Sequence, residues 1–341
     1  MANKITIADI ARQLGIATST VSRAINNHPN ISENVKMRVW EVANKMGYGR
    51  NLNLQRANNI VIIVPELYNQ FYCSIIDAIS TNIKSTNYNV GIHCSYNSHD
   101  KEVQIIDNLN TDELAFLIIS RSMDSLNSKH LNQVANKGIP IIMFNRVDYD
   151  FRCPKFVIDN YMDGYLATNH LIKSGYKRIA FAAKHYNCNV YNERIRAYRD
   201  ALEHAEIEFD NDLVIYSELT AEDIRKVIEL FLSVVPPIDA LLLPNFYAAL
   251  EATRIAKNRN MSIPTQLGVL SFDEEIYSQL NTPSITTIER PLTKLGEAIA
   301  QQVNYFLENK KMLAKNLNIF SSDLIIRGST LRKNKLSSYV E

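Results

Sequence analysis

Short hydrogen-bonding side chains gather on one side of a segment near the start of the chain. From Thr18 to Asn26 they fall at helical spacing, whereas Val21 and Ile25 point to the opposite side. The polar set is Thr18, Ser19, Ser22, Arg23 and Asn26. A helix with small hydroxyl groups can approach the major groove of DNA closely enough to meet base edges. We expect Thr18 and Ser19, at the N-terminal end, to touch bases, and Arg23 to reach a guanine or a phosphate. The alternative is a solvated face on a small protein-binding bundle.

A second group of polar and aromatic residues recurs at the ends of apolar runs in the rest of the chain. The candidates are Asn69, Phe71, Tyr72, Ser120, Arg146, Asp159, Arg194, Asn245, Asp273 and Arg290. Carboxylates and guanidinium groups bind sugar hydroxyls in pairs, while an aromatic ring covers the apolar face of the sugar. Each residue alone has the ordinary alternative of a loop side chain. Their recurrence at one edge indicates a ligand site.

The first group requires a small helical domain to position it. Residues 7–14 carry an apolar stripe at i, i+3, i+4 and i+7, with Thr6 as N-cap, Asp9 three residues later and Gly15 at the end. A third helix opens at Ser32 and has its own apolar stripe up to Met46. Three helices with a tight glycine turn predict a helix-turn-helix domain. Thr6 and Ser32 are candidate phosphate contacts, because helix N-termini attract anions.

The second group requires parallel sheets. Apolar β-branched runs at 60–64, 88–93, 115–120, 139–144, 156–159, 178–183, 213–216, 240–244 and 267–272 alternate with helical patterns. Such strands are typical of parallel sheets covered on both faces. About 280 residues is large for one such sheet, so we expect two stacked α/β lobes. The ligand site then lies in the cleft between them, beyond the carboxyl ends of the strands.

Charge is distributed unevenly along the chain. Residues 1–58 contain eight Lys/Arg and three Asp/Glu, a formal charge of +5, whereas the remainder contains 29 basic and 33 acidic residues, or −4. A basic head on a mildly acidic body fits a head that meets a polyanion. Four scattered cysteines argue against a metal centre or disulfide framework. The absence of a signal-like or membrane-spanning apolar run predicts a cytoplasmic, nucleoid-associated protein without membrane contact.

The segment "TIADIARQLGIATSTVSRAINNHPNISENVKMRVWEVANKMGY" resembles the lactose-repressor/galactose-repressor (LacI/GalR) family, and the likeness extends over nearly the whole chain. The resemblance implies that Thr18 and Ser19 choose the operator. It also matches Thr20, Ser22 and Arg23 to the family's Thr-Val-Ser-Arg motif and places Asn26 at a base or backbone contact. Tyr48 and Asn51 match the family's Gly-Tyr-x-Pro-Asn element, which adds them to the DNA-binding candidates.

The chain departs from the family in two places within this region. Ala17 stands where the family usually has a capping Ser. Arg50 replaces the Pro of the hinge, Ala57 stands where a minor-groove Leu is usual, and the first body strand begins about five residues early. Leu54 is the remaining apolar wedge for a kinked duplex.

In the body, Asn69 and Phe71 resemble the family's Asn-Pro-Phe-Phe element, Arg194 its Arg before Gly-Phe, and Asp273 its Phe-Asp-Asp. Asn245 matches the Asn of an Asn-Asp pair, and Phe246, which replaces the Asp, joins the effector-binding candidates at that position. Arg290 stands where the family often has Gln. Compared with the family, the pocket would have one carboxylate fewer and one guanidinium more. This difference favours an acidic or phosphorylated ligand, unless Arg290 pairs with Asp273 or Glu289.

Together these features predict a helix-turn-helix head over residues 1–49, a hinge over 50–59, a two-lobed α/β domain like the type I periplasmic binding proteins over 60–332, and a tail over 333–341. The predicted function is a transcriptional regulator, expected to be a repressor. It would bind a near-palindromic double-stranded DNA operator as a homodimer and respond to a sugar, sugar acid or sugar phosphate. No phosphate-cradling glycine loop, metal-ligand spacing or nucleophile elbow is present, so no enzyme activity, cofactor or metal is expected. A cytoplasmic sugar-binding enzyme or sensor with the same fold is the alternative.

Overall fold

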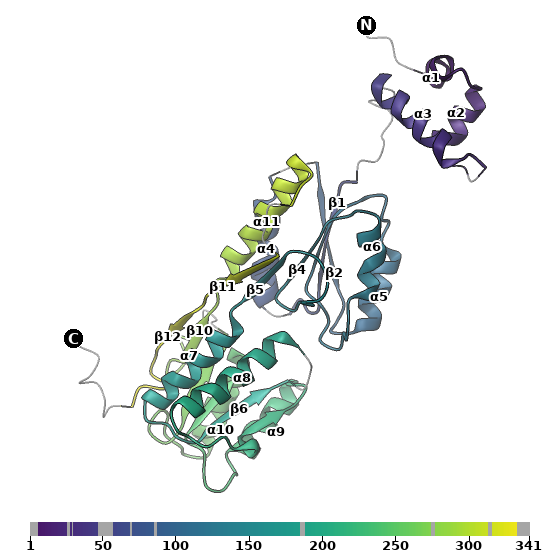
Figure 1. The fold of residues 1–341 in the computed structure, drawn as a ribbon. Coiled ribbons are helices and arrows are strands. Elements are labelled where there is room, and N and C mark those ends of the chain that lie inside the picture. Colours follow the sequence, from purple (N-terminus) through teal and green to yellow (C-terminus); the bar gives the residue numbers. More distant parts are fainter. Residues whose placement is uncertain are drawn as a thin grey trace. The chain divides into compact units, whose positions relative to one another are not determined.

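The computed structural model describes residues 6–25, 28, 30–46, 57–68, 70–84, 87–184, 188–273, 277–312 and 316–332. The chain divides into two compact units, residues 1–58 and residues 59–341 (Figure 1). Five predicted contact residues lie outside the described residues, as does the expected tail. They are Asn26, Tyr48, Asn51, Leu54 and Asn69.

The first unit contains the three predicted helices: α1 (Ile7–Leu14), α2 (Thr18–Ile25) and α3 (Glu33–Met46). Their apolar stripes meet in one small core around Ile10, Val21 and Val39, each fully buried. Gly15 ends α1 with φ +66°, a left-handed conformation that a side chain would disfavour. The helix-turn-helix prediction is confirmed.

The first lobe of the second unit is a six-stranded sheet in the order β11-β5-β4-β3-β1-β2, and every strand pair is parallel. The strands are β1 (Asn59–Val64), β2 (Asn89–Cys94), β3 (Leu114–Ile119), β4 (Ile141–Phe144), β5 (Lys155–Ile158) and β11 (Leu317–Phe320). Helices α4 (Gln70–Asn82) and α11 (Leu292–Asn309) supply one apolar core. The opposite core lies beside α5 (His99–Asn108), α6 (Asn132–Asn136) and the short 3-10 helix η1 (Lys129–Leu131).

The second lobe is a six-stranded sheet in the order β12-β10-β9-β8-β6-β7. Its strands are β6 (Ile179–Ala183), β7 (Val214–Tyr216), β8 (Ala240–Leu243), β9 (Gly268–Ser271), β10 (Thr286–Glu289) and β12 (Asp323–Ile325). Helices α9 (Ala221–Phe231) and α10 (Phe246–Asn258) cover one core, and α7 (Asn160–Lys173) and α8 (Asn189–His204) cover the other. The 3-10 helix η2 (Asn211–Leu213) precedes β7.

Each predicted strand is present, with its ends shifted by no more than about two residues. The expectation of purely parallel sheets is wrong at one edge, because β12 pairs antiparallel with β10. The run that ends at Arg290 forms β10, whereas the short strands β11 and β12 were not predicted. They arise because the chain crosses between the lobes three times: after β5, after β10 and after β11 (Figure 1). After the third crossing the chain enters the second lobe as β12, which runs antiparallel to β10.

Candidate functional site

The start of α1 is held by a capping arrangement. Both the amide and the hydroxyl of Thr6 donate to the Asp9 carboxylate, at 2.9 and 2.7 Å. The hydroxyl bond and then the amide bond lower the pKa of Asp9. Since the Thr6 hydroxyl already serves this carboxylate, a phosphate would meet the helix end with a negative side chain beside it. This arrangement makes Thr6 a less favourable phosphate ligand than its helix-terminal position alone suggests.

The polar face of α2 is accessible. Thr18, Ser19 and Arg23 are exposed, whereas Thr20 and Ser22 are half-buried. On the opposite side, Val21 and Ala24 are fully buried in the core of the unit. The three exposed residues are therefore available to a partner, while Thr20 and Ser22 lie nearer the helix packing.

Ala17 precedes α2 and caps it through the backbone alone. Its carbonyl accepts from the amides of Thr20 and Val21, at 2.9 and 3.1 Å. The amides of Thr18 and Ser19 begin the helix without a side-chain cap of the Ser type, which leaves this end open to an anion. Ser32 precedes α3 in the same way, is exposed, and accepts through its carbonyl from Val35 and Lys36, each at 3.0 Å.

In the second unit, a cavity of about 570 Å³ is lined by residues of both lobes. It lies beyond the carboxyl ends of the strands, where the sheet rule places ligand sites. The residues of the first lobe that line it are Glu66, Tyr68, Gln70, Phe71, Tyr72, Asn145 and Arg146. Those of the second lobe are Lys184, Val190, Tyr191, Arg194, Leu219, Thr220, Ala221, Ile224, Pro244, Asn245, Tyr247, Asp273 and Arg290.

The cavity brings together most of the candidates from the second polar group. Those that line it are Phe71, Tyr72, Arg146, Arg194, Asn245, Asp273 and Arg290. Three others do not line it: Ser120, Asp159 and Phe246. Each of these three makes other contacts in the structure.

The reasons differ for each of the three. Ser120 is fully buried and hydrogen-bonds the Tyr72 hydroxyl at 3.2 Å, so it supports a lining residue from behind. Asp159 caps α7 by accepting from the Met162 amide at 2.9 Å. Phe246 is buried in the apolar core beneath α10, and the next residue, Tyr247, faces the cavity instead.

Arg146 is fixed in the wall of the first lobe. It donates to the Asn97 side-chain oxygen at 2.5 Å and lies 3.7 Å from a Glu66 carboxylate oxygen. Burial opposes its charge, yet Tyr72, Cys188 and Glu66 raise its pKa, so it stays protonated. Its guanidinium carbon lies 5.8 Å from the centre of the Tyr72 ring.

Arg194 enters from α8 and is only 3% exposed. Its Nε donates to the Asn160 side-chain oxygen at 3.1 Å, and its guanidinium lies 4.2 Å from the centre of the Phe272 ring. Its Nη2 is buried without a hydrogen-bond acceptor among the described residues. Burial first, and the nearby Arg290 second, lower the pKa of Arg194. A buried guanidinium nitrogen with no acceptor favours an anion or a hydroxyl oxygen in the cavity.

Close packing of α7 against α8 sets the position of Arg194. A Cβ added at Gly164 would lie 2.8 Å from the Arg194 carbonyl oxygen and 2.9 Å from the Cβ of Ala197. Small residues on both helices therefore let the two backbones approach. The small side chain of Ala197 is part of this contact.

Arg290 makes an ion pair with Asp273 within the second lobe. Its guanidinium also lies 4.2 Å from the centre of the Phe71 ring, which belongs to the first lobe. Arg290 thus lies over one face of the Phe71 ring. Because Arg290 pairs with Asp273, the case for an anionic ligand depends on the other lining cations rather than on Arg290.

Sequence reasoning missed several lining residues, including Lys184, Asn145 and Glu66. Lys184 follows β6 directly, Asn145 follows β4, and Glu66 lies two residues after β1. The strand-end rule used for the other candidates would have found them. Burial lowers the pKa of Lys184, as expected for an ammonium withdrawn from water.

Cations exceed carboxylates among the described lining residues. Arg146, Lys184, Arg194 and Arg290 are four cationic side chains, and the carboxylates are Glu66 and Asp273. Both carboxylates already lie beside an arginine. The excess of positive charge and its low exposure suit a ligand that carries negative charge.

The lobes are also joined beside the cavity by direct hydrogen bonds. The side-chain Nδ2 of Asn189 donates to the backbone carbonyl oxygen of Asn145 at 3.0 Å, and the backbone amide of Val147 donates to Asn189 Oδ1 at 3.3 Å. Tyr149 donates to the Glu193 carboxylate at 3.1 Å. The beginning of α8 is therefore tied to the first lobe, in the same helix that presents Arg194.

The cavity lining contains no histidine or cysteine among the residues that the structure describes, so it offers a metal ion only oxygen ligands. None of the described helices is long and apolar enough to cross a membrane.

Comparison with known families matches both units of the chain. Residues 6–51 match the family model for bacterial regulatory proteins of the LacI family. Residues 57–320 match the model for periplasmic binding proteins and the sugar-binding domain of the LacI family.

Curated relatives are similar over nearly their full length. The transcriptional regulator RegA of Clostridium saccharobutylicum is 28% identical over 331 residues, which cover 95% of this chain and 99% of the relative. The repressor CytR of Escherichia coli K12 is 27% identical, with 95% and 96% covered. These relatives are named as transcriptional regulators, and the alternative of a sugar-binding enzyme is not favoured.

Solved structures show the same fold. The cellobiose complex of the transcriptional regulator CelR superposes with a TM-score of 0.70 at 21% identity, covering 95% of this chain and 99% of that one. The lac repressor dimer bound to operator and an anti-inducer superposes with a TM-score of 0.72 at 18% identity, covering 97% and 100%. From its head, its two-lobed body and both family matches, the chain belongs to the LacI family of DNA-binding transcriptional regulators.

Proposed function

We propose that this protein is a repressor whose affinity for its operator is set by an anionic sugar derivative, a sugar acid or sugar phosphate, bound in the cavity between the lobes. One observation supports the choice of an anion most directly: Arg194 holds a buried nitrogen without an acceptor in a cavity where cations exceed carboxylates. The polar and aromatic lining, with Tyr191 and Tyr247 beside the cations, suits the hydroxyl groups and apolar faces of a sugar.

On the DNA side, we propose that Thr18, Ser19 and Arg23 contact base edges or nearby phosphates and that Ser32 contacts a phosphate. The exposure of all four supports this assignment. One such helix spans too few base pairs for useful specificity, so two heads of a homodimer on a near-palindromic site are expected. Several roles stay predictions from the sequence. They are the DNA-binding roles of Thr6, Thr20, Ser22, Asn26, Tyr48, Asn51 and Leu54, and the ligand roles of Asn69, Ser120, Asp159 and Phe246. The expected domain limits and the cytoplasmic location also stay predictions.

The ligand would act by changing the angle between the lobes. Helix α8 carries Arg194 as well as Asn189 and Glu193, which bond to the first lobe. A ligand bound to Arg194 would therefore shift α8 and change the hydrogen bonds that join it to the first lobe. If ligand and operator are coupled, the free energy of operator binding must differ between the ligand-bound and the ligand-free protein, typically by about 1–3 kcal/mol.

The test uses full-length protein with three matched probes: one hexose, its uronic acid and its 6-phosphate. Thermal shift measures binding, because a ligand that binds only the folded protein raises its Tm. A gel shift with the chain's own upstream DNA then measures operator affinity with and without the probe. We expect a charged probe to raise Tm and to change operator affinity, and the neutral hexose to do neither at the same concentration.

The variant Arg194→Gln removes the positive charge and keeps an amide. Loss of a charge-assisted hydrogen bond should weaken binding of the charged probe by roughly 10- to 150-fold, from about 1.5–3 kcal/mol. Arg199→Gln on the same helix is the matched control, because Arg199 lies over Phe209 away from this cavity. Tighter binding of the neutral hexose than of both charged probes would contradict the proposal.

A further inference from the structure

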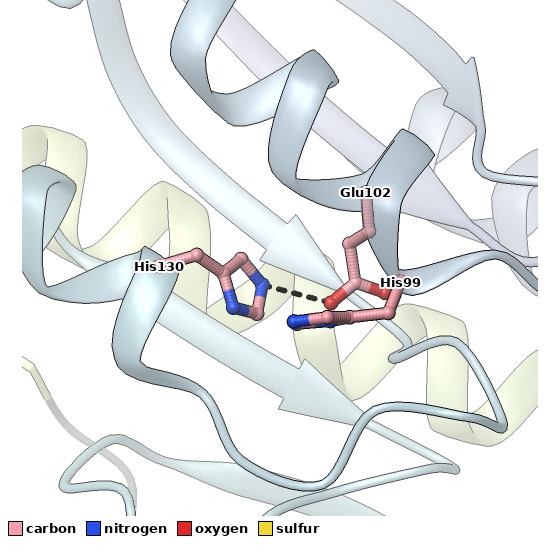
Figure 2. A group of neighbouring side chains, drawn as sticks. All are labelled: His99, Glu102 and His130. Atoms are coloured by element: carbon pink, nitrogen blue, oxygen red, sulfur yellow. Dashed lines mark ion pairs between the residues drawn. The ribbon is translucent and has the colours of Figure 1, made fainter.

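A second cluster of polar side chains lies in the first lobe, apart from the cavity between the lobes. His99 and Glu102 lie one turn apart on α5, and His130 approaches from η1 (Figure 2). Their ligand-forming atoms all lie within 4.8 Å of one another. Figure 2 shows the two rings and the carboxylate turned toward a common point. None of the three lines the cavity.

The carboxylate of Glu102 is fully buried and its bonds are incomplete. Its Oε2 accepts from the Ser122 amide at 2.5 Å, while its Oε1 lies 2.8 Å from His130 Nε2. In spite of that short distance, neither Oε1 nor either ring nitrogen of His130 makes a hydrogen bond of adequate geometry among the described residues. Such atoms are rare in folded proteins and call for an explanation.

The position of Glu102 adds to this requirement. Its side chain is fully buried, and its Oε1 lies where water does not reach it and has no hydrogen-bond donor among the described residues. A buried carboxyl oxygen in this situation needs a donor or a cation. A bound metal ion would satisfy it.

His99 is held as a metal-binding histidine usually is. Its Nδ1 lies 2.9 Å from the Ser125 hydroxyl, so the ring orientation is fixed and Nε2 is left for a ligand. The ring packs edge-on against His130, with centroids 5.0 Å apart and planes at 81°. Two imidazoles at close quarters repel if both are protonated, but both can bind one metal ion in their neutral forms.

We propose that His99, Glu102 and His130 form a site for a divalent transition-metal ion, with Zn²⁺ as the best match. Two imidazole nitrogens and one carboxylate are a ligand set that zinc accepts, with a water in the fourth position. Ligand atoms at about 2.0–2.2 Å from a tetrahedral zinc ion lie roughly 3.3–3.6 Å apart. The observed separations run from 2.8 Å, between His130 Nε2 and Glu102 Oε1, to no more than 4.8 Å, so they lie on both sides of this value and side-chain rotations would have to adjust them.

The experiment measures zinc binding by the full-length protein after dialysis against a chelator. Zn²⁺ is titrated in competition with a chromophoric chelator, in buffer without sugar or DNA, so the result does not depend on the proposed effector. We expect each wild-type chain to bind one Zn²⁺ ion tightly. His130→Ala and His99→Ala should weaken this binding by at least about 100-fold, and Ser125→Ala, which removes only the orienting hydroxyl, by about 10-fold.

Two controls keep the result interpretable. His204→Ala removes a histidine of the second lobe that contacts Tyr165, and it should leave zinc affinity unchanged. Circular dichroism and Tm of each variant establish that it is folded; His99 is half-exposed, so its replacement is the milder of the two ligand changes.

The free cysteines, above all the exposed Cys73, are the competing zinc ligands. Co²⁺ in place of Zn²⁺ distinguishes them, because thiolate ligands add a charge-transfer absorption that nitrogen and oxygen ligands lack. We expect a four-coordinate cobalt spectrum without that band. The proposal is overturned if the wild type shows no stoichiometric binding, if folded His99→Ala and His130→Ala bind as tightly as wild type, or if the thiolate band is present. The close contact between His130 and Glu102 would then be an ordinary buried charge pair.

Discussion

The stability of the second lobe should fall in mild acid because of one buried histidine. His170 on α7 is 7% exposed, and one ring nitrogen lies 2.8 Å from the Thr330 hydroxyl. Burial lowers the pKa of His170 from its ordinary 6.5 to about 4. The folded protein therefore resists protonation that the unfolded chain accepts. Stability is complete above pH 6.5 and is lost as the pH falls from 6.5 toward 4.

The size of the effect follows from that difference of pKa. At about 1.4 kcal/mol per pKa unit, the full loss is about 3 kcal/mol, and at pH 5 it has reached about 2 kcal/mol. His170→Gln keeps a polar group near Thr330 but does not titrate. The variant should therefore lack this part of the pH dependence.

The assay is urea unfolding of the wild type and of His170→Gln at pH 8 and pH 5, followed by circular dichroism. The free energy of unfolding of the wild type, minus that of the variant, should drop by about 2 kcal/mol between the two pH values. Taking the difference cancels the titration of groups that the two proteins share. A difference that stays constant between pH 8 and pH 5 would show that the ring is reached by water or by a counter-charge, and the reasoning would be refuted.

The remaining predictions concern the head, a buried carboxyl group on α7 and the packing of the first lobe. Thr18→Ala should change the order of preference among operator sequences, whereas Ser32→Ala should weaken all of them alike, as a gel shift over a small operator set would reveal. Burial raises the pKa of Asp163 to about 6, so its ionisation costs stability. The urea-derived stability of wild type minus that of Asp163→Asn should therefore fall by up to about 3 kcal/mol as the pH rises from 4 to 7, the opposite sign to His170. A Cβ at Gly296 would lie 2.6 Å from the Cβ of Ala78, so Gly296→Ala should destabilise by about 1–3 kcal/mol in spite of its better helix propensity, measured as a lower urea midpoint.

Most of the fold could be predicted because its signals are local. The apolar runs that became β1, β3, β6 and β8 are continuous and fully or almost fully buried, as parallel strands between helices should be. Strands β11 and β12 gave no such signal, because they are short edge strands whose side chains are exposed or half-buried. Their pairing depends on where the chain lies after its third crossing, and no local pattern reports that.

The site was predicted in part for a related reason. The end of a strand locates a residue near the cavity but does not say which way its side chain points. Ser120 points behind Tyr72, while Asn145 and Arg146 follow β4 and face the cavity. The proposed metal site was not predicted either, since 27 residues lie between Glu102 and His130 in the chain and only the fold brings the two side chains together.

The triple crossing between the lobes also constrains the order in which the protein can form during translation. The first lobe takes β1 to β5 from the first half of the body, but its covering helix α11 and its edge strand β11 come from residues 292–320. The ribosome must therefore make almost the whole chain before the first lobe can close its core. A nascent chain halted after β10 would contain all the residues of the head, but its first lobe would lack α11 and β11. The apolar face of α4, which packs against α11 in the complete protein, would then be exposed.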